Sequence, residues 1–186
     1  TSAYLAKEMM RNNRDLKIFT TLHGTDITLV GLEPSFLPLV KFSIEKSDGV
    51  TAVSRFLKEK TIINYSCESD IRVIPNFVDT DHFKPENSCD FRKTIAPKGE
   101  KILVHTSNFR PVKRVPDTIR IFEKVQKEIP SKLILVGDGP DRSECERLTR
   151  QLELGDSVKF LGKQEALVEI LSSSDLFLIP SQSESF

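Results

Sequence analysis

The sequence lacks several features that would place a protein in a class at once. It has only three cysteines, Cys67, Cys89 and Cys145, which are far apart and odd in number. They show neither the close spacing of a metal site nor the paired count of a disulfide framework, and such usage is typical of a reducing cytosol. We therefore expect a cytoplasmic protein without a cysteine-bound metal.

An excess of one charge and long apolar runs are also missing. The 27 basic and 27 acidic side chains give a formal net charge of zero, so no overall field attracts nucleic acid or an anionic membrane. No apolar run approaches the roughly 20 residues that cross a bilayer. The opening residues, TSAYLAKEMM, lack the basic and then apolar pattern of a signal peptide. We expect no nucleic-acid partner, no membrane span and no secretion signal.

The sequence also lacks an initiator methionine and a dinucleotide-binding motif. The chain has no initiator methionine and stops at Phe186, directly after an apolar strand pattern. We therefore interpret it as a piece of a longer protein, in which a shared site is incomplete. No strand is followed by the GxGxxG fingerprint of dinucleotide-binding enzymes, which argues against an NAD-dependent Rossmann enzyme.

What the sequence does contain is a regular alternation of strand and helix patterns. Short apolar runs predict strands over residues 16–22, 49–53, 71–74, 101–106, 132–136, 157–161 and 175–179. Helical spacing predicts helices over 2–12, 34–47, 54–65, 115–129 and 167–171, and another that ends at Gly155. Such alternation predicts an α/β fold of βαβ units, with parallel strands covered on both faces.

One stretch interrupts this alternation. Residues 75–100 contain three prolines and no sustained period, and we expect one short helix in them, over 89–94. We interpret the stretch as an interdomain connection. The sequence thus predicts two Rossmann-like domains, 1–88 and 89–186, neither of which needs to be whole.

A basic loop follows the strand predicted over 101–106. Arg110, Lys113 and Arg114 fall within five positions, and a helical pattern begins immediately afterwards. In an open α/β sheet, ligands sit at the carboxyl ends of the strands, where a helix N-terminus and backbone N–H groups favour anions. The functional interpretation is a phosphate or diphosphate cradle. A solvated basic turn explains the charge pattern equally well.

Three more strand ends carry polar or permissive residues. HGTD at 23–26 combines an imidazole, a hydroxyl and a carboxylate, and its position makes a functional role as plausible as a structural one. The glycines of GDGP at 137–140 let a ligand approach the backbone, although a tight β-to-α turn is the better explanation. Glu184, just past the last strand, is either an acceptor for sugar hydroxyls or a surface acid.

Taken together, these motifs resemble a known family. LHGTDIT, EKSDGVTAVS, SNFRPVKRV, LILVGDGP, FLGKQ and SESF are similar to the retaining GT-B glycosyltransferases of family 4 over essentially the whole chain. Two of these motifs, LHGTDIT and SNFRPVKR, are more specific and resemble the malate-transferring group of this family, which acts in bacillithiol biosynthesis. The resemblance implies a GT-B fold, with an acceptor domain and a nucleotide-sugar domain facing a cleft. It implies transfer of N-acetylglucosamine from UDP-N-acetylglucosamine to L-malate with retention of configuration, without a cofactor or metal ion.

The resemblance also implies roles for the charged residues. Lys113 matches the family's phosphate-binding lysine. The family's usual arginine, five positions earlier, is Asn108 here, so we expect Arg110, or else Arg114, to supply that charge. Glu184 matches the first acid of the family's paired-glutamate motif, which faces the sugar; the second acid lies beyond the chain.

Further roles follow from the same resemblance. His23 matches the histidine that contacts the donor hexose near the reacting carbon, and Thr25 and Asp26 follow it where the acceptor is expected. Donor contacts are implied for Asn108, Lys113, Gly137, Lys163 and Glu184. The implied mechanism has the malate hydroxyl attack from the face that the diphosphate leaves. The leaving phosphate takes the proton, and cations at Lys113 and Arg110 stabilise the departing diphosphate.

Alternatives stay open at this point. A non-catalytic nucleotide-sugar or anion-binding module would suit a fragment that lacks half of the paired-acid motif. A family member with a lipid or polysaccharide acceptor would suit the shared motifs. Against a membrane surface, Phe36, Leu39, Val40 and Ile44 lie on one face of helix 34–47, which we interpret as ordinary core packing. A homo-oligomer also stays open.

Overall fold

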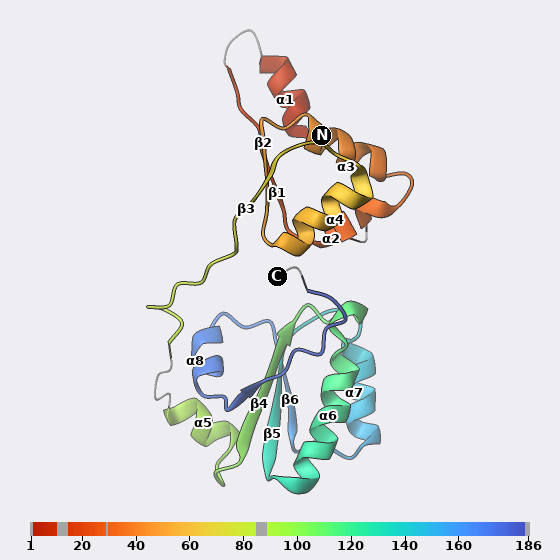
Figure 1. Cartoon of the computed structure of the whole chain (residues 1–186). Helices are drawn as coiled ribbons and strands as arrows, with labels where there is room; N and C mark the ends of the chain where they lie inside the picture. The colour runs from red at the N-terminus through yellow and green to blue at the C-terminus, as the bar shows by residue number, and fades with distance from the viewer. Residues whose placement is uncertain (1, 11–14, 29, 85–88, 185–186) are drawn as a thin grey trace. The chain divides into compact units, whose positions relative to one another are not determined.

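A computed structural model describes residues 2–10, 15–28, 30–84 and 89–184. The chain divides into two compact units, Thr1–Phe77 with 184–186, and Val78–Ser183. Each is an α/β unit with a parallel sheet (Figure 1). The domain boundary predicted after residue 88 stays a prediction, because residues 85–88 lie outside the described part of the chain.

The first unit contains a three-stranded sheet of order β1-β2-β3, formed by Phe19–Leu22, Gly49–Ala52 and Ile71–Val73. Its helices are α1 (Ser2–Met10), α2 (Thr25–Thr28), α3 (Leu37–Glu45) and α4 (Arg55–Tyr65), with a 3-10 turn η1 over Val30–Leu32. Alternate strand residues, including Leu22, Val50 and Ile71, face the core. The predicted N-cap is confirmed, because the Leu57 N–H donates to Ser54 Oγ over 3.3 Å.

The second unit contains a four-stranded sheet of order β6-β5-β4-β7. Its strands are β4 (Lys101–Ser107), β5 (Ser131–Gly137), β6 (Val158–Gly162) and β7 (Leu176–Phe177). Its helices are α5 (Cys89–Ile95), α6 (Val115–Glu128), α7 (Arg142–Gln151) and α8 (Leu167–Ser172), with a 3-10 turn η2 over Pro111–Lys113.

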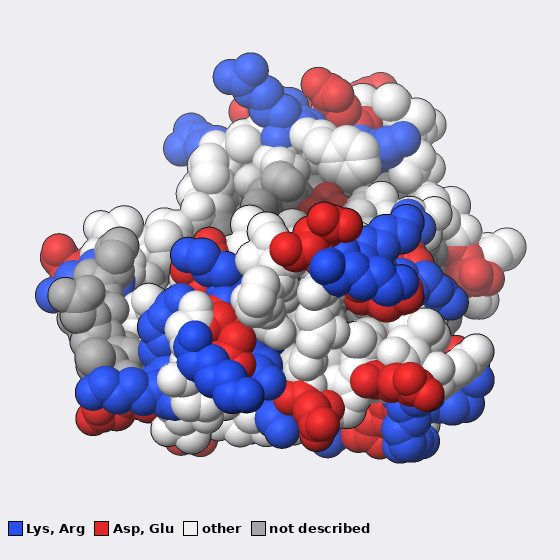
Figure 2. Space-filling model, turned by 90° about the horizontal axis from the view of Figure 1, so that it is seen from below, with Lys and Arg blue, Asp and Glu red and all other residues white. Residues whose placement is uncertain are grey.

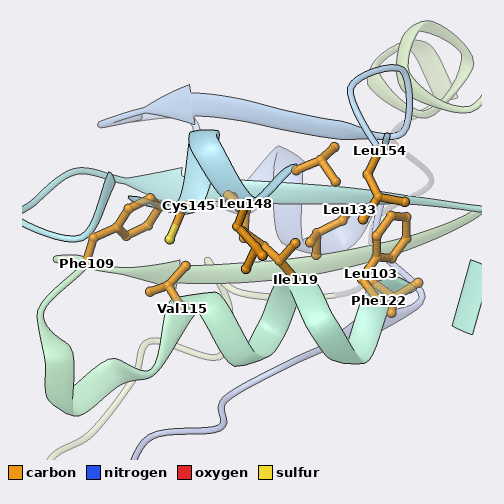
Figure 3. Close-up of a cluster of buried hydrophobic side chains, with 11 residues drawn as sticks. Leu103, Phe109, Val115, Ile119, Phe122, Leu133, Cys145, Leu148 and Leu154 are labelled. Carbon is orange, nitrogen blue, oxygen red and sulfur yellow. The ribbon is translucent and has the colours of Figure 1, made fainter. Parts of the chain in front are cut away.

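Both faces of the second sheet are covered, as its apolar strands predict. Leu103 and Leu133 point toward α6 and α7, where they pack with Ile119 and Leu148 (Figure 3). The intervening residues of β4 and β5 point the other way and pack with Ile170 of α8. Helices α6 and α7 therefore lie on one side of the sheet, and α5 and α8 on the other (Figure 1).

The strand order creates a switch point between β4 and β7. From β4, the chain adds β5 and then β6 on one side, and it then returns to place β7 on the other side of β4. All pairings in this sheet are parallel. In open α/β sheets, ligands bind outside the carboxyl ends of the strands at such a switch point. The topology thus selects the loop after β4 and the segment after β7.

Several local predictions were wrong. Helix α3 begins at Leu37 with Pro38 in its first turn, not at Pro34, and only Ile44 of its expected core face is buried. Phe36 and Leu39 are 48% and 49% exposed, whereas Val40 and Ile44 pack in the core of the first unit, so only part of the expected face is core. Helix α7 ends at Gln151 rather than at Gly155.

The α7 error has a backbone cause. The left-handed residue after α7 is Glu153, with φ of 57°, and Leu154 N–H donates to the Thr149 carbonyl over 3.0 Å. A non-glycine residue therefore makes the turn that was expected of Gly155. The last strand is also shorter than predicted, because only Leu176 and Phe177 pair with β4.

Candidate functional site

Three strand ends lie in one row at the carboxyl edge of the second sheet. Ser107 of β4 pairs with Gly137 of β5, and Val136 of β5 pairs with Gly162 of β6. The residues that follow these positions therefore emerge side by side. This row brings together the predicted donor contacts of the second half, Asn108, Arg110, Lys113, Gly137 and Lys163.

The loop after β4, residues 108–114, is called the basic loop below. Its centre is the 3-10 turn η2, in which Lys113 N–H donates to the Arg110 carbonyl over 2.8 Å. Arg114 ends the turn in a left-handed conformation, with φ of 52°, and is also the N-cap of α6. The basic loop therefore ends where the first turn of α6 begins.

The cations of the basic loop differ in their partners. Arg114 Nε donates to Asp117 Oδ2 over 2.6 Å, and the same carboxylate also accepts from Arg120. Arg110 is exposed and makes no side-chain ion pair with the described residues. Lys113 is half-buried. Because Asp117 already offsets the charge of Arg114, the geometry supports Arg110 over Arg114 as the second cation for an anionic ligand.

The glycines of GDGP serve the contact between two loops. A Cβ on Gly137 would lie 1.8 Å from the Ser107 carbonyl oxygen, and one on Gly139 would lie 1.9 Å from that of Asn108. Gly137 also has φ of +116°, which side-chain-bearing residues rarely adopt. The tight-turn interpretation therefore explains both glycines, since they let the β5 turn press against the basic loop.

Arg142 connects the ends of β5 and β6. Its Nε donates to Glu146 Oε1 over 2.9 Å, its Nη1 lies 3.7 Å from Asp138 Oδ2, and its guanidinium lies 6.0 Å from the Phe160 ring centroid. The hydrogen bond to Glu146 raises the pKa of Arg142 above its ordinary value. Lys163 is exposed and follows Gly162, whose φ is +68°. Arg142 thus braces the turn that presents Lys163.

Gln182 ties the segment after β7 to the basic loop. Its N–H donates to the Val112 carbonyl over 2.9 Å. Glu184 follows two residues later and is half-buried. The two segments that flank the switch point are therefore hydrogen-bonded to each other through their backbones.

The HGTD segment belongs to the first unit. His23 is exposed, and Gly24 is buried with φ of +145°. The Gly24 carbonyl accepts from Ile27 N–H over 2.8 Å and so begins α2, a single helical turn. The Tyr65 hydroxyl donates to the Ile27 carbonyl over 3.3 Å and anchors the turn to α4. Thr25 and Asp26 lie in α2, and their side chains are outside the described atoms.

Sequence reasoning missed two polar residues of β4. His105 is fully buried, and its ring lies between the Leu178 carbonyl and the Ser107 hydroxyl. The signal was present, because three polar residues, His105, Thr106 and Ser107, follow the apolar residues of the run ILVHTS. Buried polar groups are nearly always hydrogen-bonded, so such residues in a buried strand indicate a specific network.

The described residues were also compared with the patterns of a charged surface, a metal site and a membrane-spanning helix. Basic and acidic side chains are interspersed on the face shown in Figure 2. No group of three or more His, Cys, Asp or Glu with the geometry of a metal site occurs in the described ranges. Among these same residues, every helix is too short or too polar to cross a bilayer.

Comparison with known proteins identifies the family. The model of glycosyl transferases group 1 matches residues 87–186, and that of glycosyltransferase family 4 matches residues 1–82. The chain belongs to the group 1 glycosyl transferases. This membership confirms the resemblance to family 4 that the sequence motifs predicted.

Individual relatives agree with this membership. The chain is 45% identical over 185 residues to the N-acetyl-alpha-D-glucosaminyl L-malate synthase of Bacillus anthracis, which covers 99% of this chain and 48% of the relative. It is 29% identical to the phosphatidylinositol N-acetylglucosaminyltransferase GPI3 subunit of Saccharomyces cerevisiae (strain YJM789), over 80% of this chain and 34% of that one. The chain therefore spans half or less of the length of these curated relatives.

A solved structure supports the fold. Anabaena Alr3699/HepE, in complex with UDP and glucose, superimposes with a TM-score of 0.81 at 20% identity, over 98% of this chain and 50% of that one. At such identity the likeness concerns the fold alone. The fold class predicted from the sequence, α/β of the GT-B type, is confirmed.

Proposed function

We propose that this group 1 glycosyl transferase chain is part of an enzyme that transfers N-acetylglucosamine from UDP-N-acetylglucosamine to L-malate, with retention of configuration. The observation that carries the donor class is the basic loop at the switch point of the second sheet. The 45% identity to the malate synthase of Bacillus anthracis supports the sugar and the acceptor.

In this proposal the second unit binds the donor. Arg110 and Lys113 stabilise the negative charge that develops on the departing diphosphate. Preorganised cations and donors act on the transition state in this way, because they need no reorganisation when the bond breaks. Asn108, Gly137 and Lys163 contact the nucleotide from the same row of strand ends. Glu184, which groups with the first unit, accepts hydrogen bonds from the sugar hydroxyls.

The first unit contributes the acceptor side of the reaction. His23 positions and polarises the donor sugar near its reacting carbon, and Thr25 and Asp26 contact the malate. The malate hydroxyl attacks from the face that the diphosphate leaves, and the leaving phosphate takes the hydroxyl proton. The reaction then requires no general base from the protein, and no metal ion or cofactor enters the proposal.

The test is UDP release by the full-length protein with UDP-N-acetylglucosamine, with and without L-malate. We expect release that depends on malate. Lys113→Ala should lower kcat by about 10²–10³-fold, the typical cost of removing one group that stabilises transition-state charge. Lys124→Ala removes an exposed cation from α6 and serves as the matched control, with unchanged kinetics. Full activity in Lys113→Ala would refute the phosphate role.

One observation favours a second acceptor class. Phe36, just before α3, and Leu39 within it are exposed, so the core-packing argument against a membrane surface does not hold for these two residues. A phosphatidylinositol headgroup in mixed vesicles therefore belongs in the same assay as malate. UDP release with the lipid and none with malate would keep the donor and reaction type but overturn the acceptor.

A further inference from the structure

A continuous chain of hydrogen bonds runs through the interior at the end of β4. His105 Nδ1 lies 2.8 Å from the Leu178 carbonyl oxygen, and His105 Nε2 lies 2.9 Å from Ser107 Oγ. The Phe109 N–H donates to the same Ser107 Oγ over 3.2 Å. The chain thus begins in the segment after β7 and ends within the basic loop.

The backbone partners fix the direction of the two outer hydrogen bonds. A carbonyl oxygen can only accept, so His105 Nδ1 carries a proton and donates to Leu178. Ser107 Oγ accepts from the Phe109 N–H, and its own proton can be donated to His105 Nε2. His105 Nδ1 therefore carries a proton, and both ring nitrogens are hydrogen-bonded.

Phe109 shows why this chain matters for the basic loop. Its φ is +40°, a left-handed conformation that is unusual for an aromatic residue, and its side chain is fully buried in the core beside Val115 and Cys145 (Figure 3). Its carbonyl accepts from Asp141 N–H over 3.0 Å. Residues in such conformations persist when their surroundings over-determine them, and they cluster at functional sites.

The strained residue separates two exposed ones. Asn108 precedes Phe109 and Arg110 follows it, so a buried anchor reverses the chain between two side chains that face solvent. The hydroxyl of Ser107 fixes the anchor's N–H, and His105 fixes that hydroxyl. Any change in this pair is therefore transmitted to Arg110, and through η2 to Lys113.

We propose that His105 and Ser107 are positioning residues for the diphosphate. Their hydrogen bonds hold the backbone of the basic loop at Phe109. The bond from His105 to the Leu178 carbonyl also holds the basic loop next to the segment after β7. Neither residue contacts the substrate in this proposal. The backbone bond from Gln182 to Val112 is the second point of attachment between these segments. This inference rests on the proposed function, because it requires the basic loop to bind phosphate.

The test compares binding of UDP with binding of uridine by calorimetry on the full-length protein. Uridine has the base and ribose but no phosphate, so it does not report on the contacts that Arg110 and Lys113 make with the diphosphate. His105→Phe keeps an aromatic ring and loses both hydrogen bonds, and Ser107→Ala loses only the hydroxyl. We expect each to weaken UDP by about tenfold, from the buried groups left unpaired, and to leave uridine unchanged. Ser107→Thr should restore UDP affinity.

Thr149→Val is the matched control. Thr149 is a buried hydroxyl of α7 in the same unit, bonded to the Cys145 carbonyl over 2.9 Å, and its loss should leave both affinities unchanged. Equal weakening of UDP and uridine by Ser107→Ala, or unchanged UDP affinity, would overturn the positioning role. Failure of the wild-type protein to bind UDP would instead overturn the proposed function.

Nitrogen NMR of His105 tests the network without any ligand. This chain contains three histidines, and the His105→Phe variant assigns the His105 signal by its loss. We expect the His105 signal of the neutral form with the proton on Nδ1, and loss of that signature in Ser107→Ala. A proton on Nε2 of His105 in the wild-type protein would contradict the proposed hydrogen bond from the Ser107 hydroxyl to that nitrogen.

Discussion

The contact between the β5 turn and the basic loop predicts a graded response to glycine substitution. Four glycines of the second unit differ in two properties, the space for a Cβ and the sign of φ. Gly155 has neither restriction, since nothing lies within 4 Å of a Cβ there and no positive φ occurs. Gly99 has φ of +80° but open space, whereas Gly139 has the clash without a positive φ, and Gly137 has both.

The magnitudes follow from these two terms. Gly155→Ala should change the free energy of unfolding by less than about 1 kcal/mol, or stabilise slightly through the unfolded chain. Gly99→Ala should cost about 1–3 kcal/mol for a left-handed alanine. Gly139→Ala should cost about 1–3 kcal/mol, as overpacking does, because the Cβ meets a backbone carbonyl. Gly137→Ala carries both terms and should cost about 2–6 kcal/mol.

Urea unfolding followed by circular dichroism measures this series. The midpoints should fall in the order Gly155, then Gly99 and Gly139, then Gly137, at unchanged m-values. UDP binding gives a second readout, because only the Gly139 and Gly137 substitutions displace the basic loop. If Gly137→Ala and Gly139→Ala unfold at the same urea concentration as Gly155→Ala, the reasoning about loop contact is wrong.

Other substitutions test individual charges and a thiol. Arg110→Ala should lower kcat by about 10²-fold, whereas Arg114→Ala should lower it less than about tenfold, since Asp117 already pairs with that side chain; equal losses in steady-state UDP release would contradict the assignment. Burial acts to raise the pKa of Asp175, but hydrogen bonds from Ile102 N–H, Arg92 and Lys101 outweigh it and lower that pKa. Asp175 therefore contributes fully to the free energy of unfolding at pH values above the ordinary carboxyl pKa. That contribution is lost as the pH falls through the lowered pKa of Asp175 in the folded protein. Asp175→Asn should cost about 1–2 kcal/mol in urea unfolding at pH 7 and progressively less under acid; a constant difference down to pH 2 would be the contrary result. Burial raises the pKa of the Cys145 thiol to about 12, so the native protein should resist alkylation there at pH 8, as mass spectrometry of the labelled peptides can show.

The strand and helix order was predictable because burial on both faces leaves a local trace. Strands β4 and β5 read as continuous apolar runs, and the apolar spacing of α6 marks its buried face at Val115, Ile119 and Phe122. Errors occurred where local signals were ambiguous. Pro34 and Pro38 both suit a first helical turn, and only packing decided that α3 begins at Leu37.

The candidate site was only partly predictable. The cations of the basic loop were recognised from their position after a strand, and the family resemblance favoured Lys113 and then Arg110, but charge and spacing alone do not separate Arg110 from Arg114. The ion pair from Arg114 to Asp117 distinguishes them, and it depends on the left-handed turn at Arg114 that starts α6. The glycines of GDGP were assigned their turn role only weakly, because the carbonyls that they contact lie about 30 residues earlier.

The sequence alone determined the α/β class, the family and the loop that carries the cations, because these depend on residue type and local spacing. Tertiary structure alone decided the switch point, since strand order β6-β5-β4-β7 brings segments more than 60 residues apart to adjacent positions. It also decided the role of His105, whose partner Leu178 is 73 residues away. A hydrogen bond across such a separation leaves no local pattern, because its geometry exists only once β7 has paired beside β4.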